Sequence, residues 1–260
     1  MPRYGLVILG GTFDRLHRGH EALLETAFSL GRTVAIGVTT DAFLAAHPKP
    51  RAGRLQPFRL RRAAVARWVA RHHPGRPVRI VPLADRFGGS LDPEVDALVV
   101  SAETAEGGRA VNRERARRGL GPVPVAVVPL VLADDLRPVS SRRIRAGEID
   151  RAGRRRTPLP VVVSVPDHAA RTWAARAVRR AFPTARIRFR GAGATGRPVG
   201  TPPGTLRVTL RPVGTNDWSV GIRTAEVVLH PRPLGGCTEA VRVRRLASLL
   251  RPASGRGGRI

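Results

Sequence analysis

Apolar residues recur along the first 150 residues with two different spacings. Short runs rich in β-branched residues, typical of buried strands, occur at 5–9, 33–38, 78–82, 96–100 and 123–128. Stretches with helical spacing separate them, near 18–30, 56–72, 104–118 and 140–147. Strands that alternate with helices predict a parallel sheet, and strands that are apolar on both faces need helices on both sides. The pattern therefore predicts a Rossmann-like, doubly wound α/β domain that binds its ligands at the carboxyl ends of the strands.

The rest of the chain begins with the same alternation of strand and helix and then becomes rich in strands. A strand at 161–165, a helix over 169–181 and a strand near 185–190 precede β-rich runs at 205–211, 218–222 and 225–229. This order predicts a second, smaller α/β or α+β domain. Glycine, proline and an arginine run coincide between the two parts, as in a linker. The expected division is a first domain over 1–151, a basic linker over 152–159, a second domain over 160–250 and a flexible tail over 251–260.

Composition narrows the class of protein. The chain has 260 residues, of which 42% are apolar, enough for a packed core in one large or two ordinary domains. One cysteine excludes both a disulfide framework and a cysteine-ligated zinc site. No apolar run approaches the roughly 20 residues that span a bilayer, and the first apolar run ends too early for a signal peptide. We therefore expect a cytoplasmic protein with no membrane partner.

The chain is strongly basic, and its basic residues are almost all of one type. The formal net charge is +27, and 45 of the 46 basic residues are arginine, whereas asparagine and glutamine together number three. A composition bias across the whole genome explains such uniformity better than a dedicated nucleic-acid surface does, so a nucleic-acid partner is not expected. Residues 1–150 carry +9 and residues 151–260 carry +18. For the basic second part we favour a structural or homo-oligomerising role.

The segment with the clearest chemistry leaves the first strand and enters the first helix. It reads Gly-Gly-Thr-Phe-Asp-Arg-Leu-His-Arg-Gly-His over residues 10–20. Glycines let backbone N–H groups approach an anion, and a helix N-terminus favours negative charge. His17 and His20, three residues apart, can contact one phosphate. The alternative is that both histidines merely cap the turn and the helix.

A second segment, at residues 138–150, has the features of a phosphate clamp. Ser140 or Ser141 would cap a helix, so free N–H groups, hydroxyls and arginine side chains would meet at its start. Arginine-rich capped helices are common, and this segment alone would carry little weight.

Together, the two segments are similar to the nucleotidyltransferase superfamily marked by His-x-Gly-His. Five further stretches, at 38–41, 85–90, 97–104, 112–120 and 140–150, resemble the archaeal and eukaryotic type of phosphopantetheine adenylyltransferase. The resemblance covers about residues 4–151. It implies transfer of AMP from ATP to 4′-phosphopantetheine, giving dephospho-coenzyme A and pyrophosphate, without a covalent enzyme intermediate.

The resemblance also implies roles for individual residues. Thr12 would position the attacking phosphate and the α-phosphate, His17 would bind the α-phosphate, and Mg²⁺ would bridge ATP phosphates rather than sit among protein ligands. The residues implied at the ATP site are Gly10, Gly11, Thr12, His17, Gly19, His20, Glu103, Arg115, Ser140, Ser141 and Arg143. Glu103 and Arg115 could instead be ordinary charges on a helix face.

Lys49 is the only lysine of the chain. A lysine that persists among 45 arginines marks a place where a compact ammonium is required, and it follows the second strand at the expected ligand edge. Related enzymes use a lysine in this region for the acceptor phosphate, which assigns Lys49, with Thr12, to phosphopantetheine and to catalysis. A solvated loop lysine is the alternative.

The second part faintly resembles the inosine/xanthosine triphosphate pyrophosphatase-like domain that follows some archaeal adenylyltransferases. The resemblance rests on residues 177–183, 198–200 and 219–222. Pyrophosphate hydrolysis needs carboxylates to hold Mg²⁺, and residues 151–260 contain only four acidic side chains. We therefore expect a degenerate domain without activity.

Two alternatives to the main reading stay open. One is another cytidylyl- or adenylyltransferase, acting on nicotinamide mononucleotide, glycerol phosphate or ethanolamine phosphate. The other is a nucleic-acid-binding protein built on a retired nucleotidyltransferase fold.

Overall fold

The structure is a computed structural model that describes residues 2–47, 55–191, 204–213, 217–224, 228–235 and 238–251. Contacts divide the chain into two compact units. The first unit comprises Met1–Val131 and Val139–Ala146, and the second comprises Leu132–Pro138 and Gly147–Ile260. The expected linker, 152–159, falls inside the second unit by this division. The expected tail lies outside the described residues, apart from Arg251.

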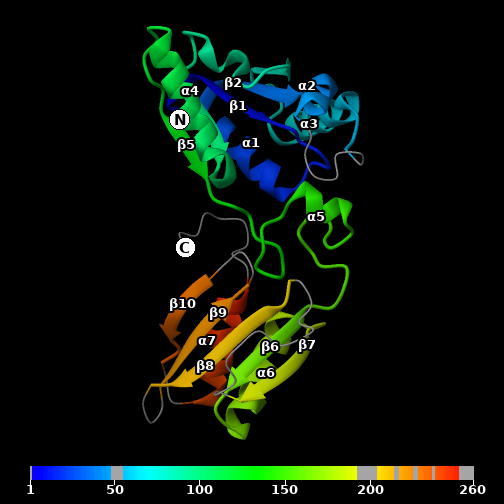
Figure 1. The fold of residues 1–260 in the computed structure, drawn as a ribbon, viewed down its shortest axis with the longest axis vertical. Coiled ribbons are helices and arrows are strands. Elements are labelled where there is room, and N and C mark those ends of the chain that lie inside the picture. Colours follow the sequence, from blue (N-terminus) through cyan, green and yellow to red (C-terminus); the bar gives the residue numbers. More distant parts are fainter. Residues whose placement is uncertain are drawn as a thin grey trace. The chain divides into compact units, whose positions relative to one another are not determined.

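The first unit contains a parallel sheet of five strands (Figure 1). Its strands are β1 (Tyr4–Gly11), β2 (Gly31–Thr39), β3 (Val78–Leu83), β4 (Ala97–Ser101) and β5 (Val125–Val128). They pair in the order β3-β2-β1-β4-β5, and every pairing is parallel. The strand order reverses between β1 and β4, which is where open sheets of this kind bind ligands. The predicted doubly wound sheet is confirmed.

Helices cover both faces of this sheet. The helices are α1 (Arg18–Leu30), α2 (Asp41–Ala46), α3 (Phe58–His72), α4 (Ala105–Arg117) and α5 (Ser141–Arg145), with 3-10 turns η2 (Gly88–Leu91) and η3 (Ala102–Thr104). On one face, Leu24 and Phe28 of α1 and Val65 of α3 pack against the strands. On the other, Val111 of α4 packs against a smaller cluster. The two-sided burial explains why the strands are apolar throughout.

Two helices of the first unit differ from the sequence prediction. Helix α2 was not expected, since it has only six residues; Thr40 caps it by accepting a hydrogen bond from the backbone N–H of Phe43, at 3.1 Å. Helix α5 is shorter than the expected 140–147, because Gly147 adopts a left-handed backbone with φ of 73° that ends it.

The second unit contains a mixed sheet of five strands. These are β6 (Pro160–Val165), β7 (Arg186–Gly191), β8 (Leu206–Pro212), β9 (Trp218–Arg223) and β10 (Val228–Pro233). They pair in the order β10-β9-β8-β6-β7. Strand β6 is parallel to both β7 and β8, whereas β9 is antiparallel to both β8 and β10. The predicted strands at 161–165, 185–190, 205–211 and 218–222 are confirmed within one or two residues.

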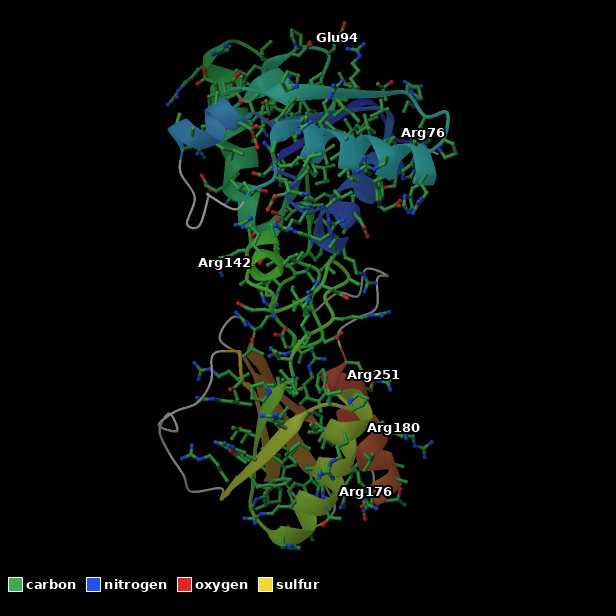
Figure 2. The ribbon with its side chains drawn as sticks, turned by 90° about the vertical axis from the view of Figure 1, so that its right-hand side faces the viewer. Arg76, Glu94, Arg142, Arg176, Arg180 and Arg251 are labelled. Carbon is green, nitrogen blue, oxygen red and sulfur yellow. The ribbon has the colours of Figure 1, made fainter. Side chains whose placement is uncertain are left out.

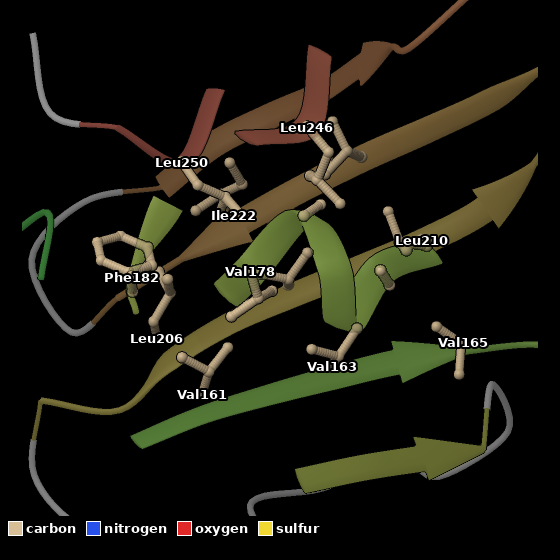
Figure 3. Close-up of a cluster of buried hydrophobic side chains, with 14 of the residues drawn as sticks. Val161, Val163, Val165, Val178, Phe182, Leu206, Leu210, Ile222, Leu246 and Leu250 are labelled. Carbon is tan, nitrogen blue, oxygen red and sulfur yellow. The ribbon is translucent and has the colours of Figure 1, made fainter. Parts of the chain in front are cut away.

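Helices α6 (His168–Ala181) and α7 (Glu239–Leu250), the two in the described part of the second unit, pack on the same face of its sheet. Figure 3 shows the resulting core, in which Val178 of α6 and Leu246 of α7 lie over alternate residues of β6, β8 and β9. Helix α7 was not predicted. Its first turns contain Val241-Arg-Val-Arg, which alternates like a strand, but Thr238 caps a helix there by accepting from the N–H of Val241.

Candidate active site

The loop that follows β1 has a tightly determined backbone. Phe13 and Arg15 adopt left-handed conformations with φ of 51° and 47°, which costs non-glycine residues about 1–2 kcal/mol each. The ring of Phe13 is fully buried and lies over Gly11, where a Cβ atom would come within 3.2 Å of it. Packing of Phe13 therefore holds the loop in its strained form, and Gly11 is the residue that allows the ring to lie there.

His17 caps the helix that the loop enters. Its Nδ1 atom accepts a hydrogen bond from the backbone N–H of Gly19 at 3.2 Å. A Cβ atom at Gly19 would lie 3.1 Å from the His17 ring, so glycine permits this close approach. The rings of His17 and His20 stack with their centroids 3.8 Å apart. The structure therefore brings together the two histidines and the glycine of the motif, and capping is one role that His17 does fill.

The protonation state of His17 follows from its surroundings. Burial lowers the pKa of His17 to about 4, and the nearby Asp14 carboxylate only partly opposes the shift. The ring is neutral at neutral pH, and because Nδ1 accepts from Gly19, the single ring proton lies on Nε2. This Nε2 atom is 3.3 Å from Oγ of Ser141 on α5. The histidine is thus prepared as a neutral hydrogen-bond donor.

Asp14 connects the loop to two other segments. One carboxylate oxygen accepts from the N–H of Gln56 at 2.9 Å, and the other contacts the guanidinium of Arg145 at 2.5 Å. Its backbone carbonyl accepts from Oγ of Ser141 at 2.7 Å. The Asp14 and Arg145 side chains are 1% and 7% exposed, so this is a buried ion pair. The Asp14 residue therefore joins its loop to α5.

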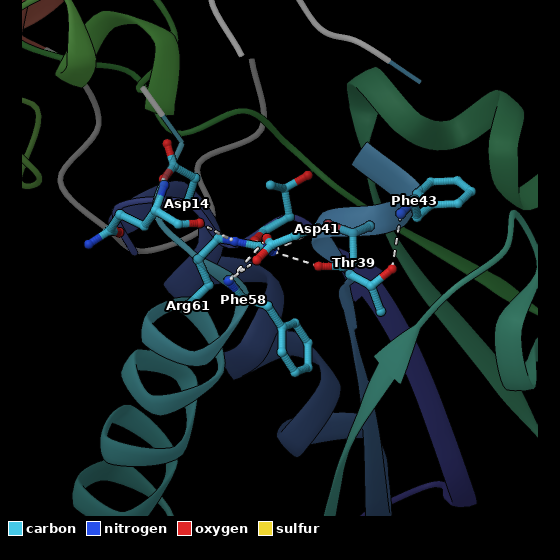
Figure 4. Close-up of polar contacts among 9 residues, drawn as sticks. Asp14, Thr39, Asp41, Phe43, Phe58 and Arg61 are labelled. Atoms are coloured by element: carbon cyan, nitrogen blue, oxygen red, sulfur yellow. Dashed lines mark hydrogen bonds and ion pairs between the residues drawn. The ribbon is translucent and has the colours of Figure 1, made fainter. Parts of the chain in front are cut away.

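Arg61 of α3, which the sequence analysis did not single out, connects the other side of the loop (Figure 4). Its guanidinium donates to the carbonyls of Thr12, Thr39 and Gln56, each at 2.8 Å. It also pairs with Asp41 at 2.7 Å. The residue is completely buried and lies beneath the ends of β1 and β2. One side chain therefore fixes the backbone of the Thr12 position.

Asp41 completes this arrangement at the surface. Both of its carboxylate oxygens accept from the N–H of Phe58, at 3.0 and 2.9 Å. That backbone hydrogen bond, followed by the Arg61 guanidinium, holds the pKa of Asp41 below its usual value. In the sequence, the sign of this network is an arginine inside a helix. Because many arginines of this chain occur in helices, that sign does not distinguish Arg61.

The predicted clamp residues lie on or beside α5. Ser140 caps this helix by accepting from the N–H of Arg143 at 3.5 Å, while Ser141 faces His17 and Asp14. The side chain of Arg143 is buried, at 2% exposure. The structure thus joins Ser141 to the histidine motif across more than 120 residues of sequence.

The other predicted site residues differ in their burial and in their contacts. Glu103 is exposed in η3, directly after β4, at the carboxyl edge of the sheet. Arg115 is buried, and its guanidinium donates to the carbonyls of Ser90, Asp92 and Gly121. It therefore holds two loops together, and its role toward ATP stays a prediction. Lys49 lies outside the described residues.

The described residues contain no group of three or more His, Cys, Asp and Glu side chains that could hold a metal ion. No helix among them is long and apolar enough to cross a membrane. The Asp14 carboxylate, in the loop before His17, is occupied by Arg145 and Gln56.

Comparison with known proteins places this site in a family. A family model described as Cytidylyltransferase-like matches residues 8–147, which span the loop after β1, the sheet and α5. The chain belongs to the cytidylyltransferase-like family. It is accordingly a nucleotidyltransferase, the class of enzyme that the sequence predicted.

Individual relatives are more specific. The chain is 46% identical over 151 residues to the phosphopantetheine adenylyltransferase of Methanopyrus kandleri, which covers 58% of this chain and 94% of that protein. Identity to the Methanothermobacter thermautotrophicus protein of the same name is 39% over 152 residues, 58% of this chain and 89% of the relative. The resemblance predicted from the sequence is confirmed.

A third relative has two functions in its name. The bifunctional phosphopantetheine adenylyltransferase/NTP phosphatase of Thermoplasma acidophilum is 36% identical over 176 residues. The alignment covers 67% of this chain and 52% of that protein. This match agrees with the faint resemblance of the second part to a nucleoside triphosphate pyrophosphatase.

Proposed function

We propose that the first unit transfers the adenylyl group of ATP to the phosphate of 4′-phosphopantetheine, forming dephospho-coenzyme A and pyrophosphate. The observation that carries the proposal is the neutral His17, which holds an Nε2–H donor at the start of α1 beside Ser141. The names of the relatives at 46% and 39% identity support the choice of substrates. An enzyme of coenzyme A synthesis with these substrates works in the cytoplasm.

The chemistry is an in-line displacement at the α-phosphorus. An oxygen of the phosphopantetheine phosphate forms the new P–O bond, and the bond to the β-phosphate oxygen breaks with release of pyrophosphate. Such a transfer needs position and charge stabilisation more than a protein nucleophile. The buried contacts of Arg61 and Asp14 supply the position, because they fix the loop on both sides of Thr12 and His17.

His17 acts as a hydrogen-bond donor to the α-phosphate. Without substrate, its Nε2–H faces Ser141 Oγ at a long 3.3 Å, and an anionic phosphate oxygen is a stronger acceptor that replaces this contact. A neutral imidazole gives up no proton and stabilises the charge that develops on the α-phosphate oxygens. His20, stacked on His17, contacts the nucleotide beside it.

The other substrate contacts are assigned from α5 and, for Lys49, from the sequence alone. Ser140, Ser141 and Arg143 hold the β- and γ-phosphates from α5, and Lys49 binds the acceptor phosphate with Thr12. Mg²⁺ bound with ATP would neutralise charge on the phosphates that Ser140, Ser141 and Arg143 hold, while the Asp14 carboxylate stays engaged with Arg145 and Gln56. The second unit takes no part in the transfer and hydrolyses no nucleotide.

Pyrophosphate release from Mg²⁺-ATP by the purified full chain tests the proposal. Release should depend on 4′-phosphopantetheine and should fall about 100- to 1,000-fold in His17→Asn, the effect of removing one donor to a reacting oxyanion. Asparagine is a good helix cap, so this variant keeps the fold while it loses Nε2–H. The matched control is His168→Asn, an exposed histidine of the second unit, which should retain full activity.

Other acceptors and nucleotides complete the test. Release with CTP, or with nicotinamide mononucleotide or glycerol phosphate in place of phosphopantetheine, would replace this substrate assignment by another member of the family. Equal activity of His17→Asn and the unmodified chain would overturn the role of the histidine.

A further inference from the structure

The second sheet has one face that neither of its helices covers. Residues of β6, β8 and β9 at alternate positions point into the core beneath α6 and α7, for example Val163, Val208 and Ile222. Their neighbours along each strand point to the opposite side. Figure 2, which views this unit at right angles to Figure 1, shows Arg176 and Arg180 on its helical side.

Arginines gather on the uncovered side because the strand register aligns them. Arg188 of β7 is level with Val162 of β6, Val162 with Arg207 of β8, and Arg207 with Arg223 of β9. We call the outward arginines of these strands the open-face arginines. They are Arg186, Arg188, Arg190, Arg207, Arg211 and Arg223.

No negative charge interrupts this surface at the strand positions. The five strands, as described, contain no aspartate or glutamate. Arg186, Arg188, Arg211 and Arg223 are exposed, while Arg190 and Arg207 are half-buried. Between them lie small outward residues, including Ser164, Thr209 and Gly221. The face is therefore positively charged and free of bulky side chains at its centre.

We propose that the open-face arginines bind the phosphate backbone of nucleic acid without regard to base sequence. Neighbouring strands are about 4.8 Å apart, so charges on β7, β8 and β9 span more than one phosphate and suit an extended polyanion. A second copy of this face would be repelled. The rings of Phe189 and Trp218 pack toward the core, so neither is offered for base stacking.

The net charge of the chain does not by itself account for the open-face arginines. Arginine enrichment throughout the chain explains the number of arginines and gave no reason to expect a nucleic-acid partner. It does not explain why six of them share one face with no acid among the strands. The inference is independent of adenylyl transfer, which belongs to the first unit.

Fluorescence anisotropy with labelled 20-base-pair duplex and 20-nucleotide RNA tests the proposal in the full chain. The first variant changes Arg186, Arg188, Arg207 and Arg223 to glutamine. The matched control removes the same number of charges from the helical side, by changing Arg179, Arg180, Arg244 and Arg251 to glutamine; all four are exposed.

The open-face variant should bind at least tenfold more weakly at 0.1 M salt, and its salt slope for the duplex should fall by about 3 to 4, near 0.9 for each lost phosphate contact. The helical-side variant should stay within about threefold of the unmodified chain, and lysine at the four open-face positions should restore binding, since phosphate contacts need charge. Adenylyl transfer should be the same in all variants, which separates this proposal from the proposed function.

Three outcomes would overturn the proposal. Equal losses in the two glutamine variants would assign binding to net charge alone. No measurable binding by the unmodified chain at 0.1 M salt would leave the face without this partner. Tighter binding to vesicles of anionic lipid than to either nucleic acid, lost in the open-face variant, would identify a membrane surface instead.

Discussion

Three arginines of the first unit, Arg61, Arg115 and Arg145, are buried and bonded, whereas the open-face arginines of the second unit lie at the surface or half-buried. The buried guanidiniums each reach groups in other elements: carbonyls of Thr12 and Thr39 for Arg61, and the Asp14 carboxylate for Arg145. The difference shows that arginine has two roles in this chain: buried arginines fix loops, and surface arginines form a charged face.

The cause lies in how each sheet is covered. Helices cover both faces of the first sheet, so its loops meet at a buried edge, where a charge persists only if it is paired or hydrogen-bonded. The helices of the second unit cover one face of its sheet, and the outward positions are exposed or half-buried, where charge costs less. Burial with partners therefore separates the arginines that fix the loops of the first unit from the open-face arginines.

Among these substitutions, Arg61→Met should have the largest effect on stability. The change leaves the carbonyls of Thr12, Thr39 and Gln56 without their donor and should destabilise the first unit by about 4–5 kcal/mol. Hydrogen exchange of β1 and β2 should quicken while that of β6 and β8 stays unchanged. Arg61→Lys should recover only part of the loss, since an ammonium cannot reproduce the fork of contacts.

A first unit as stable in Arg61→Met as in the unmodified chain would show that the buried guanidinium is dispensable. Loss of protection in both units would show that they do not unfold separately and would contradict an effect of Arg61 confined to the first unit.

The ion pair of Asp14 and Arg145 should give the next largest effect. Arg145→Met leaves a buried carboxylate with no counter-charge and should cost about 3–4 kcal/mol. The double variant with Asp14→Asn should lose less than the sum of the two single changes, because it also removes the orphaned charge. Urea denaturation of the four chains measures this coupling, and additive losses would contradict a direct pair.

The strand and helix pattern of both units could be predicted from the sequence, because hydrophobic spacing carries that information over long segments. Helix α7 was missed, since Val241-Arg-Val-Arg alternates like a strand, whereas the Thr238 cap and packing against α6 favour a helix. Helix α2 was missed because six residues hold too few turns to show a period.

The residues of the site likewise fall into those that the sequence could identify and those that it could not. Adjacent motif residues such as His17, Gly19 and His20 could be found, since their spacing places them on one turn. Arg61 could not, because its partners Thr12 and Thr39 lie far away in sequence and no local pattern distinguishes it from other helical arginines. The direction in which Ser141 faces also depends on the fold.

Acid should destabilise the first unit through His17. Its folded pKa is about 4 and its ordinary value is 6.5, so between these values the unfolded chain binds a proton that the folded chain does not. Stability therefore rises with pH across this window, by about 3 kcal/mol in total. Denaturation of the chain at pH 4.5 and pH 7, with His17→Asn beside it, measures the effect.

The variant should lose most of this pH slope, and His168→Asn in the second unit should keep it, since His168 is exposed. An unchanged slope in His17→Asn would assign the acid sensitivity to other groups.

The smallest effect should come from a single open-face arginine. Arg188→Gln removes an exposed side chain of β7 for which burial supplies no penalty, and the free energy of unfolding should change by less than about 0.5 kcal/mol. Hydrogen exchange of β6 and β7 measures this in the same experiment as Arg61→Met, which makes the two substitutions a direct comparison of an exposed and a buried arginine.

A loss of stability near that of Arg61→Met would mean that Arg188 is part of the folded framework, and the open face would then be a structural surface. A small gain in stability would instead fit like-charge repulsion among Arg188, Arg207 and Arg223, since removing one charge relieves the others.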